Sequence, residues 1–147
     1  MQNISQALAV VSFVALSTIV ATSSTTKAIA GDRVTPLVIA QVGPPITTSS
    51  GAAEIALADH LSKTGAVMYG AYYCRFCHSQ KNRFGSTAWP KINYVECAGN
   101  GASACNRAKI RVTPTWFIKG AYYPGELSLF KLAKVSGYTG ATNFKNK

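Results

Sequence analysis

Two cysteines separated by two residues follow a continuous apolar and aromatic run, and this feature constrains the fold more than any other. The run "AVMYGAYY" covers residues 66–73, and "CRFC" places Cys74 and Cys77 directly after it. An unbroken apolar run of this length is typical of a strand buried on both faces. The next segment, "RFCHSQKNRFG", is compatible with a helix that stops at Gly85. We therefore expect Cys74 at the junction of a strand and a helix.

This location favours thiol chemistry. A thiol attacks as its thiolate, and the free N–H groups and positive dipole end of a helix N-terminus stabilise that anion. Arg75 adds a positive charge beside Cys74. Cys77, one turn further on, is expected to lie close enough to resolve a mixed disulfide formed by Cys74. The spacing thus predicts a redox-active pair.

A haem attachment site would use the same residues, because the second cysteine is followed by His78 and Cys-x-x-Cys-His is also the signature of c-type haem. Such haem commonly needs a second axial ligand. After the first thirty residues the chain offers only Met68, expected inside the strand, and His60, expected on a helix surface. We therefore expect no haem and no other cofactor.

A zinc site and a purely structural disulfide would also use closely spaced cysteines. Zinc usually takes two close pairs, but seven residues separate Cys97 from Cys105. A disulfide between Cys74 and Cys77 would close so short a loop that it would constrain the unfolded chain weakly. We therefore expect no metal and prefer the redox interpretation. For Cys97 and Cys105, a bridge would stabilise the fold by about 2.5 kcal/mol, although a second redox pair that relays electrons stays open.

The first thirty residues resemble an export signal. An apolar run of about fifteen residues, "ALAVVSFVALSTIVA", precedes the small-x-small pattern Ala28-Ile29-Ala30. The leading "MQNISQ" contains no Lys or Arg, so an uncleaved membrane anchor is the alternative. No other segment reaches the roughly 20 apolar residues of a membrane span. Either interpretation places the cysteines in an oxidising compartment, where an even number of cysteines suits disulfides.

The rest of the chain is consistent with one α/β domain. We expect a signal over residues 1–30, a linker over 31–49 with one extra strand at 37–42, a domain over 50–138 and a loose polar tail over 139–147. Ser49 or Ser50 is expected to cap the first helix. The further elements expected are a strand at 92–97, a short helix at 104–110, two strands joined by a turn at Lys119-Gly120 and a helix at 126–136.

The formal charge is +10, from 15 Lys and Arg against 5 Asp and Glu. Such a charge can attract anionic lipid or an acidic protein, but a solvated basic surface is the simpler explanation. The basic residues are scattered and are not interleaved with stacking aromatics. We therefore expect no nucleic-acid partner, and a monomer.

Four segments together resemble the thioredoxin-like domain that is fused to bacterial and plant homologues of vitamin K epoxide reductase. They are "MYGAYYCRFC", "INYVEC", "VTPTWFIKG" and "VSGY", in the same order and at similar spacing between about Ser50 and Tyr138. The resemblance implies a thioredoxin-like fold, a central mixed β-sheet flanked by helices. It also implies a redox-active pair at Cys74 and Cys77, and a cis peptide between Thr113 and Pro114 that faces the sulfurs.

The resemblance further implies a disulfide between Cys97 and Cys105, and disulfide exchange with exported client proteins and with a quinone-linked membrane protein. That membrane portion would here be a separate chain. The family's frequent Pro-His between the cysteines is Arg75-Phe76 in this chain, and Tyr73 replaces a frequent Trp. The dipeptide tunes the reduction potential, so the direction of electron flow does not carry over.

The sequence therefore predicts an exported thiol-disulfide oxidoreductase of the periplasm or the thylakoid lumen. Cys74 is expected to attack and Cys77 to resolve, while Thr113 and Pro114 shape a groove for the client. The aromatic residues Tyr72, Phe76 and Trp116 are expected to give the site apolar surroundings. Glu96 and His78 are candidates for accepting a proton from Cys77. The alternative function is a binding module of the same fold with permanent disulfides.

Overall fold

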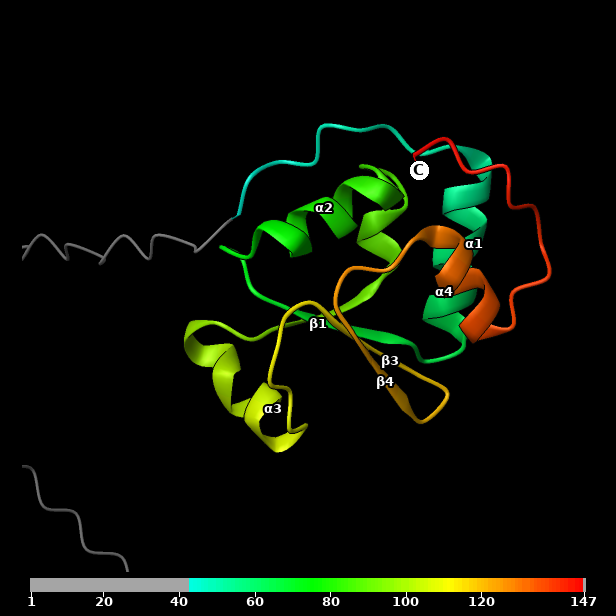
Figure 1. The fold of residues 1–147 in the computed structure, drawn as a ribbon. Coiled ribbons are helices and arrows are strands. Elements are labelled where there is room, and N and C mark those ends of the chain that lie inside the picture. Colours follow the sequence, from blue (N-terminus) through cyan, green and yellow to red (C-terminus); the bar gives the residue numbers. More distant parts are fainter. Residues whose placement is uncertain (1–42, 147) are drawn as a thin grey trace, which may run out of the picture. The chain divides into compact units, whose positions relative to one another are not determined.

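The structure is a computed structural model that describes residues 43–146. Four strands form one mixed sheet in the order β2-β1-β3-β4 (Figure 1). Their bounds are Val67–Gly70 for β1, Asn93–Glu96 for β2, Thr115–Ile118 for β3 and Ala121–Pro124 for β4. Strands β1 and β2 are parallel, whereas β3 is antiparallel to both β1 and β4. This sheet and its helices confirm the α/β, thioredoxin-like fold class.

Helices lie on both sides of this sheet. Their bounds are Ala52–Lys63 for α1, Arg75–Phe84 for α2, Ala102–Arg107 for α3 and Leu129–Ser136 for α4, with short 3₁₀ turns at Trp89–Lys91 (η1) and Gly99–Gly101 (η2). In Figure 1, α1, α2 and α4 lie on one side of the strands and α3 lies on the other. Helix α3 packs beside β2, and among residues 43–146 no other helix lies on that side of the sheet.

The core lies between the sheet and helices α1, α2 and α4. Met68, Trp116 and Ile118 project from the sheet into it and are at most 1% exposed. The helices supply apolar side chains of the same cluster, among them Leu57, Leu61, Phe84 and Leu132. Burial of this face anchors α2, which carries the cysteine pair.

The first strand is shorter than the apolar run suggests. Strand β1 ends at Gly70, and residues 71–73 form a turn closed by a hydrogen bond from the Cys74 N–H to the Ala71 carbonyl at 3.0 Å. The N–H of Tyr72 donates to the Glu96 carboxylate at 3.2 Å rather than to a neighbouring strand. Cys74 therefore follows a turn, not the strand itself.

The cap of α1 also differs from the expectation. Gly51 is the N-cap, and its N–H donates to the Glu54 side chain at 3.1 Å. The expected cap Ser50 instead accepts hydrogen bonds from the Thr87 and Ala88 N–H groups. The Ser50 hydroxyl thus joins two segments that are distant in the sequence, which the local sequence pattern did not indicate.

The C-terminal segment is held against the domain near its end, which differs from the loose tail that the sequence suggests. Phe144 is only 3% exposed and contacts the ring of Phe130. The N–H groups of Lys145 and Asn146 donate to the fully buried Glu54 carboxylate. One apolar side chain and one buried acceptor therefore hold this polar segment against the start of α1.

Several predictions lie outside the described residues: the signal over 1–30, the linker as far as residue 42 with its strand at 37–42, and residue 147. Within the part that the structure describes, no helix has the length and apolar character needed to cross a membrane.

Candidate redox site

Cys74 is the N-cap residue of α2, and its sulfur serves as the cap. The Cys77 N–H donates to Cys74 Sγ at 3.3 Å. The Cys74 thiol in turn donates to the Thr113 carbonyl at 3.4 Å. Cys74 is half-buried, whereas Cys77 is fully buried, and both are free thiols. The helix thus presents one accessible sulfur and covers the other.

The pKa values of the two thiols are shifted in opposite directions. Burial would raise the pKa of Cys74, but its hydrogen bonds with the side chains of Cys77 and Thr113 and with the N–H groups of Cys77 and Phe76 outweigh burial and lower it. Burial, a hydrogen bond with Cys74 and the charge of Cys74 raise the pKa of Cys77 to about 12. In the reduced site Cys74, the sulfur that a second molecule can reach, therefore ionises before Cys77.

The peptide bond between Thr113 and Pro114 is cis. The Thr113 carbonyl contacts Cys74 Sγ, so this loop lies directly beside the accessible sulfur. Pro114 itself is fully buried, and its carbonyl accepts a hydrogen bond from the Gly125 N–H at 2.7 Å. Thr113 is the member of this pair that forms part of the exposed edge of the site.

Arg75 and Phe76 form the outer face of the first turn of α2. The Arg75 guanidinium lies over the Phe76 ring, 4.6 Å from its centroid. Phe76 is 48% exposed, and Tyr73, just before Cys74, is 71% exposed. The lowered pKa of Cys74 arises from hydrogen bonds, so Arg75 contributes mainly a stacked cation beside an exposed apolar rim.

Trp116 belongs to the core and not to the surface of the site, which corrects the expectation. It is fully buried, its ring contacts that of Phe84, and its indole N–H donates to Gln80 Oε1 at 3.2 Å. Residues 115–118 alternate across the sheet, and Trp116 faces the helices. Tyr72 contributes through its backbone, which links Glu96 and His78.

The buried side of Cys77 is formed by β1 and β2. Gly70 lies so close that a Cβ there would stand 3.1 Å from Cys77 Sγ and 2.8 Å from the Tyr94 ring. The Tyr94 hydroxyl donates to Glu96 at 2.9 Å. Burial and the Glu96 carboxylate raise the pKa of Tyr94 well above its usual value. Glu96 is therefore connected to the surroundings of Cys77 through its hydrogen bond with Tyr94. Its other carboxylate oxygen accepts hydrogen bonds from the Tyr72 and Ala98 N–H groups.

The His78 ring contacts the backbone of two neighbouring segments. A ring nitrogen, Nε2, contacts the Tyr72 carbonyl at 2.5 Å, and because a carbonyl only accepts, Nε2 is the donor. The ring also lies against Gly43, where a Cβ would be 2.2 Å from His78 Cε1. His78 thus ties the segment before α1 to the turn before Cys74.

Cys97 and Cys105 are joined by a disulfide with a Cα–Cα distance of 5.5 Å. Cys97 follows β2, and its N–H continues the pairing with β1 by donating to the Gly70 carbonyl at 2.7 Å. Cys105 lies in α3 and is 4% exposed. The disulfide therefore fastens α3 to the sheet edge. Within residues 43–146, His, Cys, Asp and Glu side chains do not gather in threes as a metal site requires.

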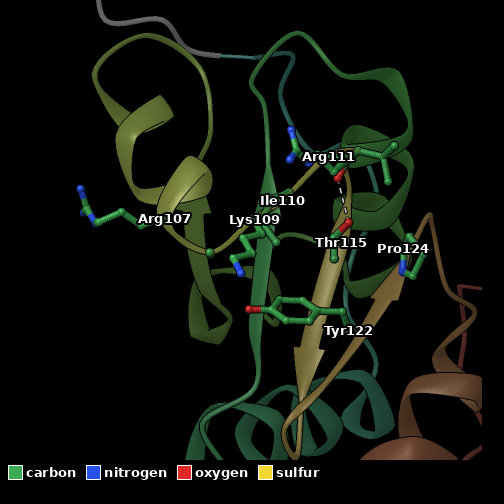
Figure 2. A pocket seen from close by; sticks show the side chains of 9 residues that line it. Arg107, Lys109, Ile110, Arg111, Thr115, Tyr122 and Pro124 are labelled. Atoms are coloured by element: carbon green, nitrogen blue, oxygen red, sulfur yellow. Dashed lines mark hydrogen bonds between the residues drawn. The ribbon is translucent and has the colours of Figure 1, made fainter.

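A groove that the sequence did not predict lies next to the cis peptide. It has a volume of about 540 Å³ and is lined by the segment from Arg107 to Val112 together with Thr115, Tyr122 and Pro124 (Figure 2). The segment reads "RAKIRV", in which basic and apolar residues alternate. That alternation was the available signal, but part of the segment was expected to be helical, whereas α3 ends at Arg107 and Lys109 has a φ of 55°.

The fold and the site together define a thioredoxin-like domain that carries a dithiol of unequal acidity. No protein-family model matches the chain. Over 101 residues the chain is 42% identical to a curated protein of Arabidopsis thaliana named thiol-disulfide oxidoreductase LTO1. The alignment covers 64% of this chain but 27% of that relative, so the chain spans about a quarter of the relative's length. The similarity supports a thiol-disulfide redox role.

Proposed function

We propose that this chain is a thiol-disulfide oxidoreductase whose reacting groups are Cys74 and Cys77. The observation that carries the proposal is the contrast between two adjacent thiols at one helix N-terminus. Cys74 is accessible with a lowered pKa, whereas Cys77 is buried with a pKa of about 12. Similarity to a protein named for this activity adds support.

The exchange proceeds in two displacements. The Cys74 thiolate attacks one sulfur of a client disulfide, forming a mixed disulfide and releasing the client's other sulfur as a thiolate. Cys77 then loses its proton and attacks the Cys74 sulfur, which breaks the mixed disulfide and releases the second client thiolate. The client gains two electrons and the domain loses two. The reverse sequence oxidises a client dithiol.

Three residues beside the cysteines bind the client and do not themselves exchange electrons: Thr113, Arg75 and Phe76. The Thr113 carbonyl lies beside Cys74 Sγ, so a client segment bound along this loop would bring its sulfur to Cys74. An extended segment can pair with exposed backbone at such an edge. The Arg75 cation on the Phe76 ring offers an apolar and positively charged surface on the other side. The buried Pro114 anchors this loop, because its carbonyl accepts a hydrogen bond from the Gly125 N–H.

Trapping tests the proposal. In a Cys77→Ser variant the second displacement cannot occur, so a mixed disulfide with a disulfide-bonded substrate such as insulin should accumulate on Cys74. A Cys74→Ser variant is the matched control, and it should trap little because Cys77 is buried. Absence of any Cys74 adduct, with no insulin reduction by the unaltered chain, would contradict an exchange role.

The reduction potential separates this proposal from a binding module with permanent disulfides. Structural disulfides lie below about −300 mV, whereas oxidoreductases lie between about −270 and −120 mV. Because the fold stabilises the Cys74 thiolate, the reduced form is favoured and we expect a value in the oxidoreductase range. Equilibration with glutathione or dithiothreitol, read by mass after alkylation, measures it.

We further propose that the partners are exported, cysteine-containing proteins and a separate membrane protein similar to vitamin K epoxide reductase. The support is the sequence resemblance, together with the apolar N-terminal segment that suggests export to the periplasm or the thylakoid lumen. Fractionation of cells expressing the tagged full chain tests export. Trapping with Cys77→Ser in those cells identifies the partners.

A further inference from the structure

We propose that the groove beside the cis peptide binds an extended client segment in which an apolar side chain is flanked by carboxylates. We call it the basic groove, lined by Arg107, Lys109, Ile110, Arg111, Val112 and Tyr122, with Ala108, Thr115 and Pro124. This inference rests on the proposed function and adds a class of substrate to it. The groove selects among clients and takes no part in the electron transfer.

The groove lies close to the reacting sulfur. Val112 lines the groove and directly precedes Thr113, whose carbonyl contacts Cys74 Sγ at 3.4 Å. Neighbouring Cα atoms are about 3.8 Å apart, so the groove begins one residue from the loop that touches the reacting sulfur. A client cysteine at Cys74 would therefore place residues close to it in the chain within the groove.

Exposed apolar side chains line the groove. Tyr122 is 50% exposed and Val112 is 53% exposed, and both border a hollow of about 540 Å³. Figure 2 shows the Tyr122 ring lying along the groove with the Lys109 side chain beside it, while Arg107 and Arg111 extend outward. The hydroxyl of Thr115 is already bonded to the Val112 carbonyl at 2.7 Å. The floor is thus apolar and the rim is cationic.

Among residues 43–146, no acidic group is left to neutralise the positive charge of the rim. The structure describes four acidic residues, and each is engaged elsewhere. Glu54 binds the C-terminal backbone, Asp59 pairs with Lys91, Glu96 binds Tyr94, and Glu126 pairs with Arg83. Three cations over an apolar floor complement carboxylates around an apolar side chain, so the occupant we assign is an acidic segment with an apolar anchor.

The test uses synthetic peptides with one cysteine activated as a 2-pyridyl disulfide. The Cys74 thiolate attacks the peptide sulfur and breaks its bond to the pyridyl sulfur, which leaves as coloured 2-thiopyridone. Cys77 then displaces the peptide thiol, leaving the domain oxidised by two electrons. The peptides carry Asp-Leu-Asp, Asn-Leu-Asn or Lys-Leu-Lys, placed either before or after the cysteine. Release of 2-thiopyridone by the reduced full chain gives the rate constant.

In at least one placement we expect the Asp peptide to react about tenfold faster than the Lys peptide at low salt, with the Asn peptide between them. The ratio should fall below about threefold at about 1 M salt, where the Debye length is about 3 Å. Replacement of Leu by Ser in the Asp peptide should slow it several-fold, because the apolar anchor is lost. Equal rates for the Asp and Lys peptides would overturn the inference.

Matched variants then locate the effect. A triple variant should reduce the ratio of the Asp-peptide rate to the Lys-peptide rate to about twofold or less; it combines Arg107→Gln, Lys109→Asn and Arg111→Gln. Asn is chosen at residue 109 because it tolerates the positive φ. The control removes the same charge on the other side of the sheet and combines Lys63→Gln with Lys131→Gln and Lys134→Gln, three exposed residues of α1 and α4. A control that lowers the ratio equally would refute a local groove.

Two readouts separate this inference from the proposed function. Reduction of the small, uncharged bis(2-hydroxyethyl) disulfide requires the cysteines but not the groove, so all variants should retain it. Its failure in the unaltered chain would contradict the redox proposal itself, whereas its success without a peptide preference would contradict the groove alone. Concentration-dependent dimerisation that the groove substitutions abolish would overturn the assignment in favour of a second copy of the chain as the occupant.

Discussion

Gln80 supplies the sharpest test of how the fold holds the cysteine helix. Its side chain is fully buried within α2, three residues after Cys77. Gln80 Oε1 accepts hydrogen bonds from the Trp116 indole at 3.2 Å and from the Leu127 N–H at 2.8 Å, and Nε2 donates to the Leu127 carbonyl at 3.0 Å. One amide thus connects α2 with β3 and with the segment that leads into α4.

Replacement of Gln80 by Met keeps a side chain of similar length and removes these three hydrogen bonds. The Trp116 N–H is fully buried, and leaving it without a partner would cost about 1–3 kcal/mol. The two backbone groups of Leu127 are half-buried and can be partly rehydrated, so we assign about 0.5–1.5 kcal/mol to each. The sum is a loss of about 2–6 kcal/mol in the free energy of unfolding, against a usual total of about 5–15 kcal/mol.

Denaturant unfolding of the reduced chain, followed by tryptophan fluorescence and by circular dichroism, measures this loss. Thermal unfolding should show a fall of at least about 8 °C in Tm, since 1 kcal/mol corresponds to about 4–8 °C in a domain of this size. Ser79→Met is the matched control, because Ser79 is exposed and loses a single hydrogen bond, to Glu126. We expect that variant within about 1 kcal/mol of the unaltered chain. A Gln80→Met variant as stable as this control would refute the reasoning.

Three further outcomes are expected. First, alkylation of the reduced chain should rise with pH to a midpoint below 9.0, because the fold lowers the pKa of Cys74. Its ionisation stabilises the reduced fold fully above pH 9, and this contribution is lost as the pH falls through the folded pKa; a midpoint at or above 9.0 would contradict the site geometry. Second, replacing Cys97 and Cys105 together by Ala should cost about 2.5 kcal/mol in denaturant unfolding while a Cys77→Ser background still traps substrate; loss of trapping in a folded protein would indicate a relay role instead. Third, Gly70→Ala should destabilise the reduced chain by about 1–3 kcal/mol and shift the reduction potential, because the new methyl group would press on Cys77; an unchanged stability and potential would count against this packing.

The parts of the fold that the sequence predicted are those governed by short-range patterns. The pairing of β3 with β4 follows from the turn residues Lys119 and Gly120, which have φ values of 49° and 79°. Helix α4 ends at Gly137 in the left-handed conformation, as a glycine after an amphipathic run predicts. The placement of Cys74 at the start of α2 follows from the change of pattern after the apolar run. In each case the information lies within a few residues.

The features that the sequence did not predict depend on contacts between distant segments. Trp116 is expected at the site but lies in the core, and its hydrogen-bond partner Gln80 is 36 residues away in the sequence. Phe144 anchors the C-terminal segment through a contact with Phe130, and a single apolar residue has no period to detect. The basic groove requires β4 to bring Tyr122 opposite residues 107–112. No local pattern encodes such an approach.

The two displacements are coupled, because the ionisation state of Cys74 changes the pKa of Cys77. Burial is the largest cause of the raised pKa of Cys77, and the hydrogen bond with Cys74 and its negative charge raise it further. When Cys74 enters a mixed disulfide, its charge disappears and only the effect of burial opposes ionisation of Cys77. Attack on a client should therefore make the resolving thiol more acidic at the moment when it is needed.

A Cys74→Ser variant tests this coupling, because a neutral hydroxyl then replaces the thiolate. We expect the pKa of Cys77 to fall below the value of about 12 in the unaltered chain, yet to stay above 9.0, since its burial is unchanged. Ultraviolet absorbance of the thiolate during a pH titration of the reduced protein measures the change, with circular dichroism to verify that the variant is folded. A pKa that stays at about 12 would show that burial alone determines it, and the two displacements would then be independent.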